Sequence, residues 1–284
     1  IGFGLLFSIP IGLTGMALFA YALSMLLVVR IGLSFFTVPY VALGAELSDD
    51  YAERSTIVAA RVLFTVVAGL GAAFLAFGVF LSGQDGQLNR AAYTPYAWTI
   101  AGVAFAAAAV STLGTLGSRG RLHAALPSQE KSRFLSELAE VFKNRSFNIL
   151  FGACLTLFVG LGVGGSLALH TNTYFWRLQP AQILVITLVS SFGTFLGVFI
   201  AAGLSRIVEK RAIALLGIGL IGVGQITPTL LKVSGLIPVA AELTTLIIFA
   251  LASGIGAGCA LIGFQSMMAD AADEHEHLFG ARRE

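Results

Sequence analysis

Charged residues are scarce in this chain of 284 residues: they make up 11% of it, against 57% for hydrophobic residues. A soluble domain contains about 25% charged residues. One as apolar as this could not cover its surface with polar groups. The mean hydropathy is +0.88, so the lipid bilayer is the expected solvent. We therefore predict an integral membrane protein.

Other shortages exclude further classes. The net charge of +2 gives no reason to expect a nucleic-acid partner. The two cysteines, Cys154 and Cys259, both lie in apolar runs, so we expect small core residues and neither a disulfide framework nor a metal site. The sequence has no phosphate-binding loop, no nucleophile motif and no paired metal-ligand spacing. We expect no enzyme activity and no cofactor.

Long apolar runs are what the sequence does contain. A helix needs about 20 apolar residues to cross the hydrocarbon, and the short alternating segments of a barrel are absent. Helices are then the only way to span. Eight segments qualify or nearly qualify: about 1–9, 15–43, 57–81, 96–117, 147–174, 181–205, 211–231 and 242–268. The first is short and the chain starts inside it, so we expect a piece of a longer protein.

Lysine and arginine predict the orientation of these helices, because cytoplasmic loops carry the excess of both. One side of the membrane has only Arg90, Arg177 and Lys232, while nearly all other basic residues lie on the opposite side. The loops predicted to be cytoplasmic are 44–56, 118–146, 206–210 and 269–284. We expect a multi-pass protein of a bacterial plasma (inner) membrane, acting as a monomer.

The longest connection, 118–146, divides the chain into four spans before it and four after it. We predict an N-terminal helical half at 1–117, a cytoplasmic linker at 118–146 and a C-terminal helical half at 147–284. Within the linker, apolar residues at helical spacing predict a short amphipathic helix on the membrane surface: Phe134, Leu135, Leu138, Val141 and Phe142. Two membrane halves joined in this way suggest a transporter with pseudo-symmetric halves.

Polar residues inside the second span need a reason, because an ionisable group at the membrane centre is costly. Arg30, Ser34 and Thr37 have i, i+4, i+7 spacing and form one polar stripe. The stripe can line an aqueous cavity. Alternatively, the hydroxyls bond their own backbone while Arg30 snorkels or pairs with a neighbouring helix. Pro39 removes one backbone hydrogen bond just after the stripe.

Two other spans carry candidate residues. In the third, Arg61 stands about one turn from the cytoplasmic end, and the residues alone favour a snorkelling arginine at the foot of a small-residue packing face. In the fifth, His170 and Thr173 share a predicted face with Ser166 and Tyr174. His170 can bind solute or a proton, or it can simply be a solvated histidine at the outer end. Tyr174, Phe175 and Trp176 are typical of an interfacial aromatic belt.

Small and hydroxyl-bearing residues mark several other faces. The stretches "GLGVGG" at 160–165 and "GIGAGC" at 254–259 predict close approach between helices and some flexing. The sixth and seventh spans carry uncharged stripes that suit either a polyol solute or helix packing: Thr187, Ser190, Ser191 and Thr194, then Gln225 and Thr229.

The run "TVPYVALGAELSDDYAERSTIVAAR" at 37–61 ends the second span in a knot of acids. Asp50 and Glu53 have capping-box-like spacing at the start of the next helix, where acids suit its positive end. The run resembles the signature of the glycoside–pentoside–hexuronide:cation symporters, the melibiose-permease-like branch of the major facilitator superfamily. "ADAADEHEHLFGARRE" at 269–284 is similar to that family's acidic loop after the tenth helix, and "FKNRSF" at 142–147 extends the likeness.

This resemblance implies an all-α major facilitator superfamily carrier, with helices three to ten of twelve present, that rocks by alternating access around a solute held between its halves. It implies that Arg61 borders the solute, because it matches the sugar-binding arginine of the melibiose permease. The predicted solute-binding residues are Arg61, Thr37, Arg30, Tyr40, His170 and Thr173. The predicted cytoplasmic gate, closed by ion pairs, consists of Asp49, Asp50, Glu53, Arg54, Asp270 and Asp273. The alternative role of these residues is to fix the loops, and the two roles are compatible.

Two departures from the melibiose permease bear on the cargo. Thr37 stands where that permease has an aspartate shared by sugar and cation, and Val41 stands where it has a sugar-stacking tryptophan. The resemblance implies symport of a sugar, glycoside or uronide with Na⁺ or H⁺, and the two departures leave the ion open and argue against melibiose itself. The alternatives are a carrier of lysophospholipid or another amphipathic solute with the same fold, and a membrane sensor that transports nothing.

Overall fold

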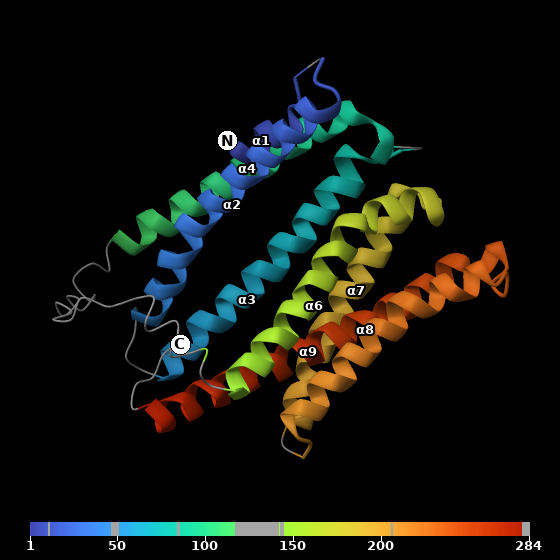
Figure 1. Ribbon diagram of the computed structural model, residues 1–284. Coiled ribbons are helices and arrows are strands. Elements are labelled where there is room, and N and C mark those ends of the chain that lie inside the picture. Colours follow the sequence, from blue (N-terminus) through green and yellow to red (C-terminus); the bar gives the residue numbers. More distant parts are fainter. Residues whose placement is uncertain are drawn as a thin grey trace. The chain divides into compact units, whose positions relative to one another are not determined.

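In the computed structural model of the chain, every regular element that is described is a helix (Figure 1). The backbone is described at 1–10, 12–46, 51–83, 86–116, 142, 145–205 and 207–279. Side chains are described over the same ranges except at 41–42, 44–46, 51–56, 58–59, 62, 116, 145–146 and 269–279. The chain divides into two compact units, Ile1–Ser128 and Gln129–Glu284.

The first unit contains four α-helices and two short elements of other helical types. In chain order these are α1 (Gly2–Phe7), α2 (Gly15–Glu46), α3 (Tyr51–Phe74), the π-helix η1 (Leu75–Phe80), the 3₁₀-helix η2 (Gly86–Leu88) and α4 (Arg90–Leu116). Three side chains of α2 and α4 hold the end of α1: the Tyr21 hydroxyl donates to the Leu5 carbonyl at 2.7 Å, Thr94 Oγ1 to the Phe7 carbonyl at 3.1 Å, and Trp98 Nε1 to Ser8 Oγ at 3.0 Å.

The second unit is built in the same way from long helices. It contains α6 (Arg145–His170), the π-helix η4 (Thr171–Phe175), α7 (Pro180–Leu204), α8 (Lys210–Val233), the 3₁₀-helix η5 (Val239–Ala241) and α9 (Glu242–Phe279). Gln179 and Gln182 form a capping box at the start of α7, and Pro180 occupies the first turn, where its missing N–H costs nothing.

Seven helices in the described part of the chain are long and apolar enough to cross a membrane. They cover the seven longer segments predicted from hydropathy: Gly15–Tyr40, Leu63–Phe80, Arg90–Thr115, Phe147–Phe175, Pro180–Leu204, Lys210–Val233 and Val239–Met268. The first predicted segment, 1–9, contains only the six-residue helix α1. The chain is therefore an integral, multi-pass membrane protein, as predicted.

Two of the predicted cytoplasmic loops were placed with wrong boundaries. The loop predicted at 44–56 is shorter, because α2 ends at Glu46 and α3 begins at Tyr51. The loop predicted at 269–284 is helical as far as Phe279. Hydropathy locates the end of an apolar run, but a helix continues while good helix formers such as Ala and Glu follow. The cytoplasmic side of these connections stays a prediction.

The boundary between the two units, at Ser128, falls within the predicted linker 118–146. Nearly all of that segment, including most of the predicted amphipathic helix, lies outside the described residues. The predicted division into halves at 1–117 and 147–284 therefore stays a prediction. Helix α6 begins at Arg145, two residues before the predicted start of the second half.

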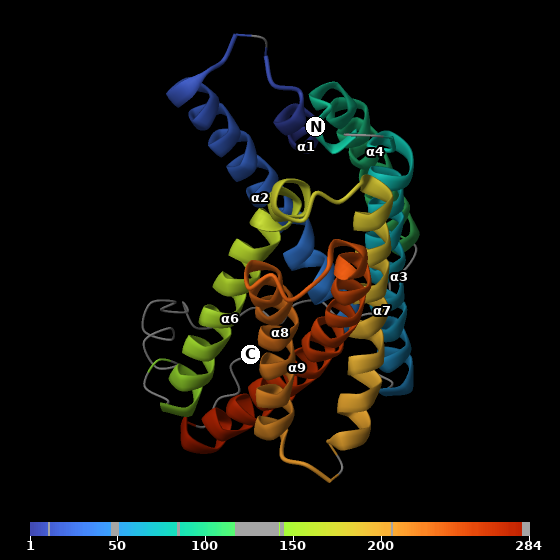
Figure 2. The same cartoon turned by 90° about the vertical axis from the view of Figure 1, so that its right-hand side faces the viewer.

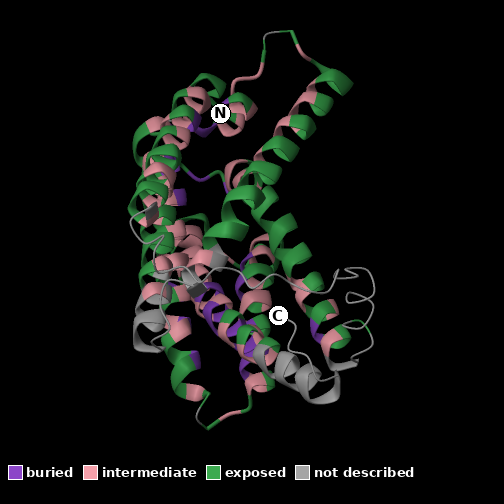
Figure 3. Ribbon diagram, turned by 90° about the vertical axis from the view of Figure 1, so that its left-hand side faces the viewer, coloured by how far each residue is buried: buried purple, intermediate pink, exposed green. Residues whose placement is uncertain are grey.

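Helix α9 forms the core of the second unit, because it packs against both α7 and α8. Buried residues gather along these contacts (purple in Figure 3). Glycines allow the helix backbones to approach: a Cβ added to Gly193 would come within 2.5 Å of the Leu251 carbonyl oxygen, and one added to Gly217 within 2.5 Å of the Ala260 nitrogen. Ala201, Ile213 and Cys259 form a buried cluster there. Small residues at helix contacts are typical of membrane proteins.

Candidate functional site

The polar stripe predicted on the second span lies on α2. Because α2 is one continuous helix from Gly15 to Glu46, Arg30, Ser34 and Thr37 share a face, as their spacing predicts. Ser34 Oγ donates to the Arg30 carbonyl at 3.0 Å. For this hydroxyl the structure therefore shows the predicted alternative, a hydrogen bond to the backbone of its own helix. Arg30 and Thr37 are exposed on the unit.

Pro39 and Tyr40 follow on the same helix. Pro39 has no N–H to give to the carbonyl four residues earlier, yet α2 continues past it for another two turns. A proline within a membrane helix frees one carbonyl and weakens the helix locally. The ring of Tyr40 stacks on that of Phe36, with centroids 5.7 Å apart. This stacking orients the phenol that was predicted to contact solute.

Arg61 is half-buried in α3, in the same unit as the stripe. Its carbonyl accepts a hydrogen bond from Thr65 Oγ1 at 2.8 Å. Among the described side chains, no hydrogen bond or ion pair joins the guanidinium of Arg61 or that of Arg30 to an acidic partner. Each cation is therefore open to an oxygen-rich ligand as far as the described residues are concerned.

His170 and Thr173 belong to the second unit: His170 is the last residue of α6 and Thr173 lies in η4. The imidazole of His170 is exposed, and its centroid lies 4.5 Å from that of the Tyr174 ring. The backbone then changes to a π-helix, with the Trp176 N–H donating to the Thr171 carbonyl five residues earlier at 3.0 Å. A π-helical turn has a different angular spacing from an α-helix, so α-helical spacing does not fix the face on which Thr173 lies.

Thr173 differs from the other hydroxyls of the unit. Its Oγ1 is buried and has no hydrogen-bond partner among the described residues. Several other hydroxyls donate to the carbonyl four residues earlier in their own helix: Ser166, Thr187, Ser191, Thr194 and Thr229. These hydroxyls therefore have a hydrogen-bond partner within their own helix. A buried hydroxyl without a partner is costly, which makes Thr173 the stronger candidate.

The structure describes the predicted gate residues only in part. Asp49 and Asp50 lie outside the described residues. Glu53 and Arg54 lie in the first turn of α3, and Asp270 and Asp273 lie in the last turns of α9, while their side chains lie outside the described ones. The inner gate therefore stays a prediction.

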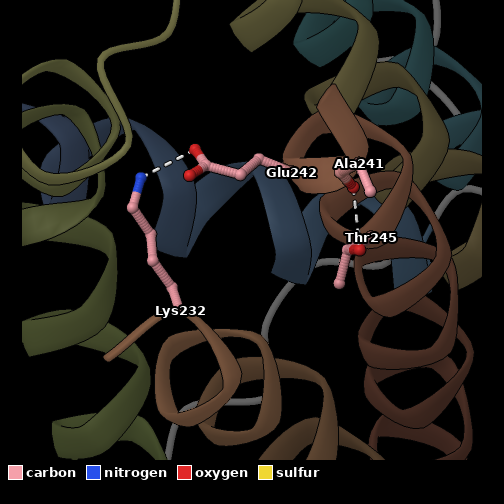
Figure 4. A network of polar contacts seen from close by, with 4 residues as sticks. All are labelled: Lys232, Ala241, Glu242 and Thr245. Atoms are coloured by element: carbon pink, nitrogen blue, oxygen red, sulfur yellow. Dashed lines mark hydrogen bonds and ion pairs between the residues drawn. The ribbon is translucent and has the colours of Figure 1, made fainter. Parts of the chain in front are cut away.

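One charged cluster was not predicted from the sequence. Lys232, in the last turn of α8, pairs with Glu242, the first residue of α9, with Nζ and Oε2 2.7 Å apart (Figure 4). The same ammonium lies 4.5 Å from the Trp176 ring centroid and 5.3 Å from that of Phe175. Opposite charges at the two ends of a short helix–helix connection were a signal for this pair.

Trp176 corrects one expectation. The sequence predicts that it belongs to an aromatic belt at the membrane interface, but its side chain is only 6% exposed. Helix periodicity does not extend through the π-helical turn, and the contact with Lys232 comes from residues far along the chain. Tyr174 is exposed, so the expectation remains open for that ring.

An apolar cavity of about 260 Å³ lies between α6 and α9. Six of its lining residues belong to α6 and one to α9: Phe147, Leu150, Phe151, Cys154, Leu155, Phe158 and Met268. A cavity with this lining favours an apolar group over water. None of the residues predicted to bind solute lines this cavity.

The comparisons with known proteins complete these observations. The chain matches the family described as MFS/sugar transport protein over residues 1–284. No curated protein and no solved structure gives a significant match.

Proposed function

Because the chain belongs to the MFS/sugar transport protein family and is thus an integral membrane transporter of small molecules, we propose that it carries a sugar, glycoside or uronide together with Na⁺ or H⁺. The all-α fold of the major facilitator superfamily that the sequence predicts is confirmed by the same match and by the seven apolar helices. The match across residues 1–284 is the observation that carries the proposal.

Several features of the first unit support a polar solute. Arg30 and Thr37 lie on one face of the 26-residue apolar span Gly15–Tyr40, and Arg61 is half-buried on α3. Cations in apolar spans usually face a cavity or a partner, and guanidinium groups bind hydroxyl and carboxylate oxygens with several donors at once. A glycoside or uronide offers both kinds of oxygen.

The second unit supports the same proposal through Thr173 and His170. The Thr173 hydroxyl has open hydrogen-bonding capacity, and the exposed imidazole of His170 lies one residue before the π-helical turn. In an alternating-access carrier each half contributes side chains to the solute. We propose that these two residues are the contribution of the second unit.

Gradient-driven uptake tests the proposal. The whole protein in membrane vesicles is given labelled glycosides and uronides under an imposed Na⁺ or H⁺ gradient. We expect accumulation that follows one gradient, and a rise of about tenfold or more in the KM for solute in Arg61→Ala, because a charge-assisted hydrogen bond is lost. Arg90→Ala is the matched control, since Arg90 is an exposed residue at the start of α4 in the same unit.

A second candidate cargo is favoured by one observation. The apolar cavity between α6 and α9 can hold part of an acyl chain, which a lysophospholipid or another amphipathic solute would supply. Labelled lysophospholipid is therefore included in the same assay. Lysophospholipid uptake without sugar uptake would contradict the proposed solute class, and the absence of any flux would favour a membrane sensor.

A further inference from the structure

Three elements of the second unit meet at the cluster formed by Lys232, Glu242, Trp176 and Phe175. Lys232 itself belongs to α8. Its ammonium lies over the rings of Phe175, in η4, and of Trp176, the next residue, and it pairs with Glu242 of α9. Figure 2 shows the α6–α7 and α8–α9 connections at the same end of this unit. One side chain thus ties the end of α6 to the α8–α9 connection.

The positions of the two charges favour a lasting contact. Lys232 lies in the last turn of α8 and Glu242 in the first turn of α9, where the helix dipoles stabilise a cation and an anion respectively. The side chains keep only 22% and 16% of their exposed area, so water screens the pair less than it would a surface pair. Cation–π contacts are also stronger where water is excluded.

The segment under this cluster has an unusual backbone. Residues Thr171–Phe175 form a π-helix, and Arg177 has a φ of 54°, in the left-handed region that bulky side chains rarely adopt. The Leu178 N–H closes the turn on the Asn172 carbonyl at 2.9 Å. Such conformations are costly and persist where surrounding contacts hold them. Lys232 provides such a contact, because its ammonium lies over the buried ring of Trp176.

The same π-helical turn carries Thr173, whose buried Oγ1 has no partner among the described residues, and it directly follows His170. We propose that Lys232 is a positioning residue: fixed by Glu242, it holds Trp176 and so keeps this turn in the arrangement that presents Thr173 and His170 to the solute. This inference rests on the proposed transport function. It adds a role to three residues outside the predicted site.

Tryptophan fluorescence and uptake kinetics test the proposal together. The chain has two tryptophans, so Trp98→Phe leaves Trp176 as the reporter. In that background we expect Lys232→Met to shift the emission of Trp176 and to raise the KM for solute about tenfold, the cost of losing a desolvated cation–π contact and its ion pair. Lys232→Arg should restore both, because arginine keeps the charge and stacks on aromatic rings. Arg211→Met removes an exposed cation at the other end of α8 and should change neither.

Each result decides the matter. An unchanged KM in Lys232→Met, with or without an emission shift, would reduce the cluster to a structural contact and overturn the positioning role. If Lys232→Met fails to reach the membrane, Glu242→Gln replaces it, with an expected rise of about threefold in KM because the ammonium loses its anchor. Failure of the transport proposal is seen separately, as no uptake of any tested solute by the wild-type protein.

Discussion

Helices α6 and α9 carry similar glycine-rich stretches, "GLGVGG" at 160–165 and "GIGAGC" at 254–259, but the second unit uses them differently. A Cβ added to Gly254 or Gly258 would meet the backbone of Ser190 or Thr194 on α7, and one added to Gly256 would meet α8, 2.6 Å from the Gly217 carbonyl oxygen. A Cβ added at any glycine of the α6 stretch would have nothing within 4 Å. Glycine spacing permits close packing of helices, and the neighbouring helix decides whether it occurs.

The two spans at opposite extremes of burial show the same contrast. In an apolar stretch of 18 residues of the α9 span, 39% of the residues are buried, against none in the corresponding stretch of α2. The α2 span has 26 residues and the α9 span has 30, and their mean hydropathies, 2.0 and 2.2, are similar. Burial is therefore not a consequence of hydropathy. In a membrane, packing depends on how closely backbones can approach, and α9 has the small residues at positions where α7 and α8 pass.

The largest effect is expected from a side chain placed in the α7–α9 contact. Gly258→Leu would drive four carbons into the backbone of Thr194 and its neighbours, which cannot move aside as a flexible side chain can. We expect a loss of about 3 kcal/mol or more in the free energy of unfolding. Unfolding in mixed detergent, followed by size-exclusion profile, measures it. An unfolding midpoint equal to wild type would mean that the two helices are not in contact here.

A smaller effect should follow from removing a buried side chain of α8. Ile213 is 2% exposed and packs with Ala201 and Cys259, so Ile213→Ala leaves a cavity and should cost about 2 kcal/mol of unfolding free energy. Ile226→Ala is the matched control on the same helix, because Ile226 is exposed; its cost should stay within about 0.5 kcal/mol. Equal losses of unfolding free energy in the two variants would mean that Ile213 does not lie in the contact between α8 and α9.

The two cysteines compare α6 and α9 directly. Cys154 is half-buried at the apolar cavity of α6, whereas Cys259 is buried against α7, with Sγ 3.4 Å from the Gly197 carbonyl oxygen. A membrane-permeable maleimide should label Cys154 at least about tenfold faster than Cys259, because access governs thiol reactivity. Labelling is read by mass spectrometry in Cys154→Ser and Cys259→Ser variants. Unfolding in dodecyl sulfate should abolish the difference. Similar labelling rates of the two cysteines in the folded protein would contradict the burial of Cys259 between α9 and α7.

The smallest effect is expected on α6, with a change of sign. Gly162→Ala places a methyl group in open space and removes the entropic cost of glycine within a helix. We expect a gain of about 0.5 to 1 kcal/mol in unfolding free energy, measured in the detergent series used for Gly258→Leu. A loss at this position would show that α6 packs closely through its glycines after all.

Much of the fold was predictable because it is encoded locally. The seven longer apolar segments became helices close to their predicted limits, since a run of about 20 apolar residues must satisfy its own backbone hydrogen bonds in lipid. The errors lie where hydropathy and helix propensity diverge, as at 269–279, and where the helix type changes, as at Thr171–Phe175. A prediction from α-helical or strand periodicity does not anticipate a π-helical turn.

The candidate site was predictable only in part. The shared face of Arg30, Ser34 and Thr37 follows from spacing along one helix, whereas the roles of Arg61, His170 and Thr173 depend on neighbours on other helices. The aromatic run at 174–176 shows the difference: its composition predicts a membrane belt, yet Trp176 is buried under a lysine that lies more than fifty positions later in the chain.

By itself the sequence determined that this protein lives in a bilayer, that it crosses as helices and that polar side chains share a face of α2, because each of these properties depends on residues within a few turns of one another. Only the tertiary structure decided which glycines meet a neighbouring backbone, that Thr173 Oγ1 is buried without a partner among the described residues, and that Lys232 joins Glu242 to Trp176. Those outcomes depend on which helix faces come together, and contacts between distant segments are set by backbone approach and packing, which no local pattern records.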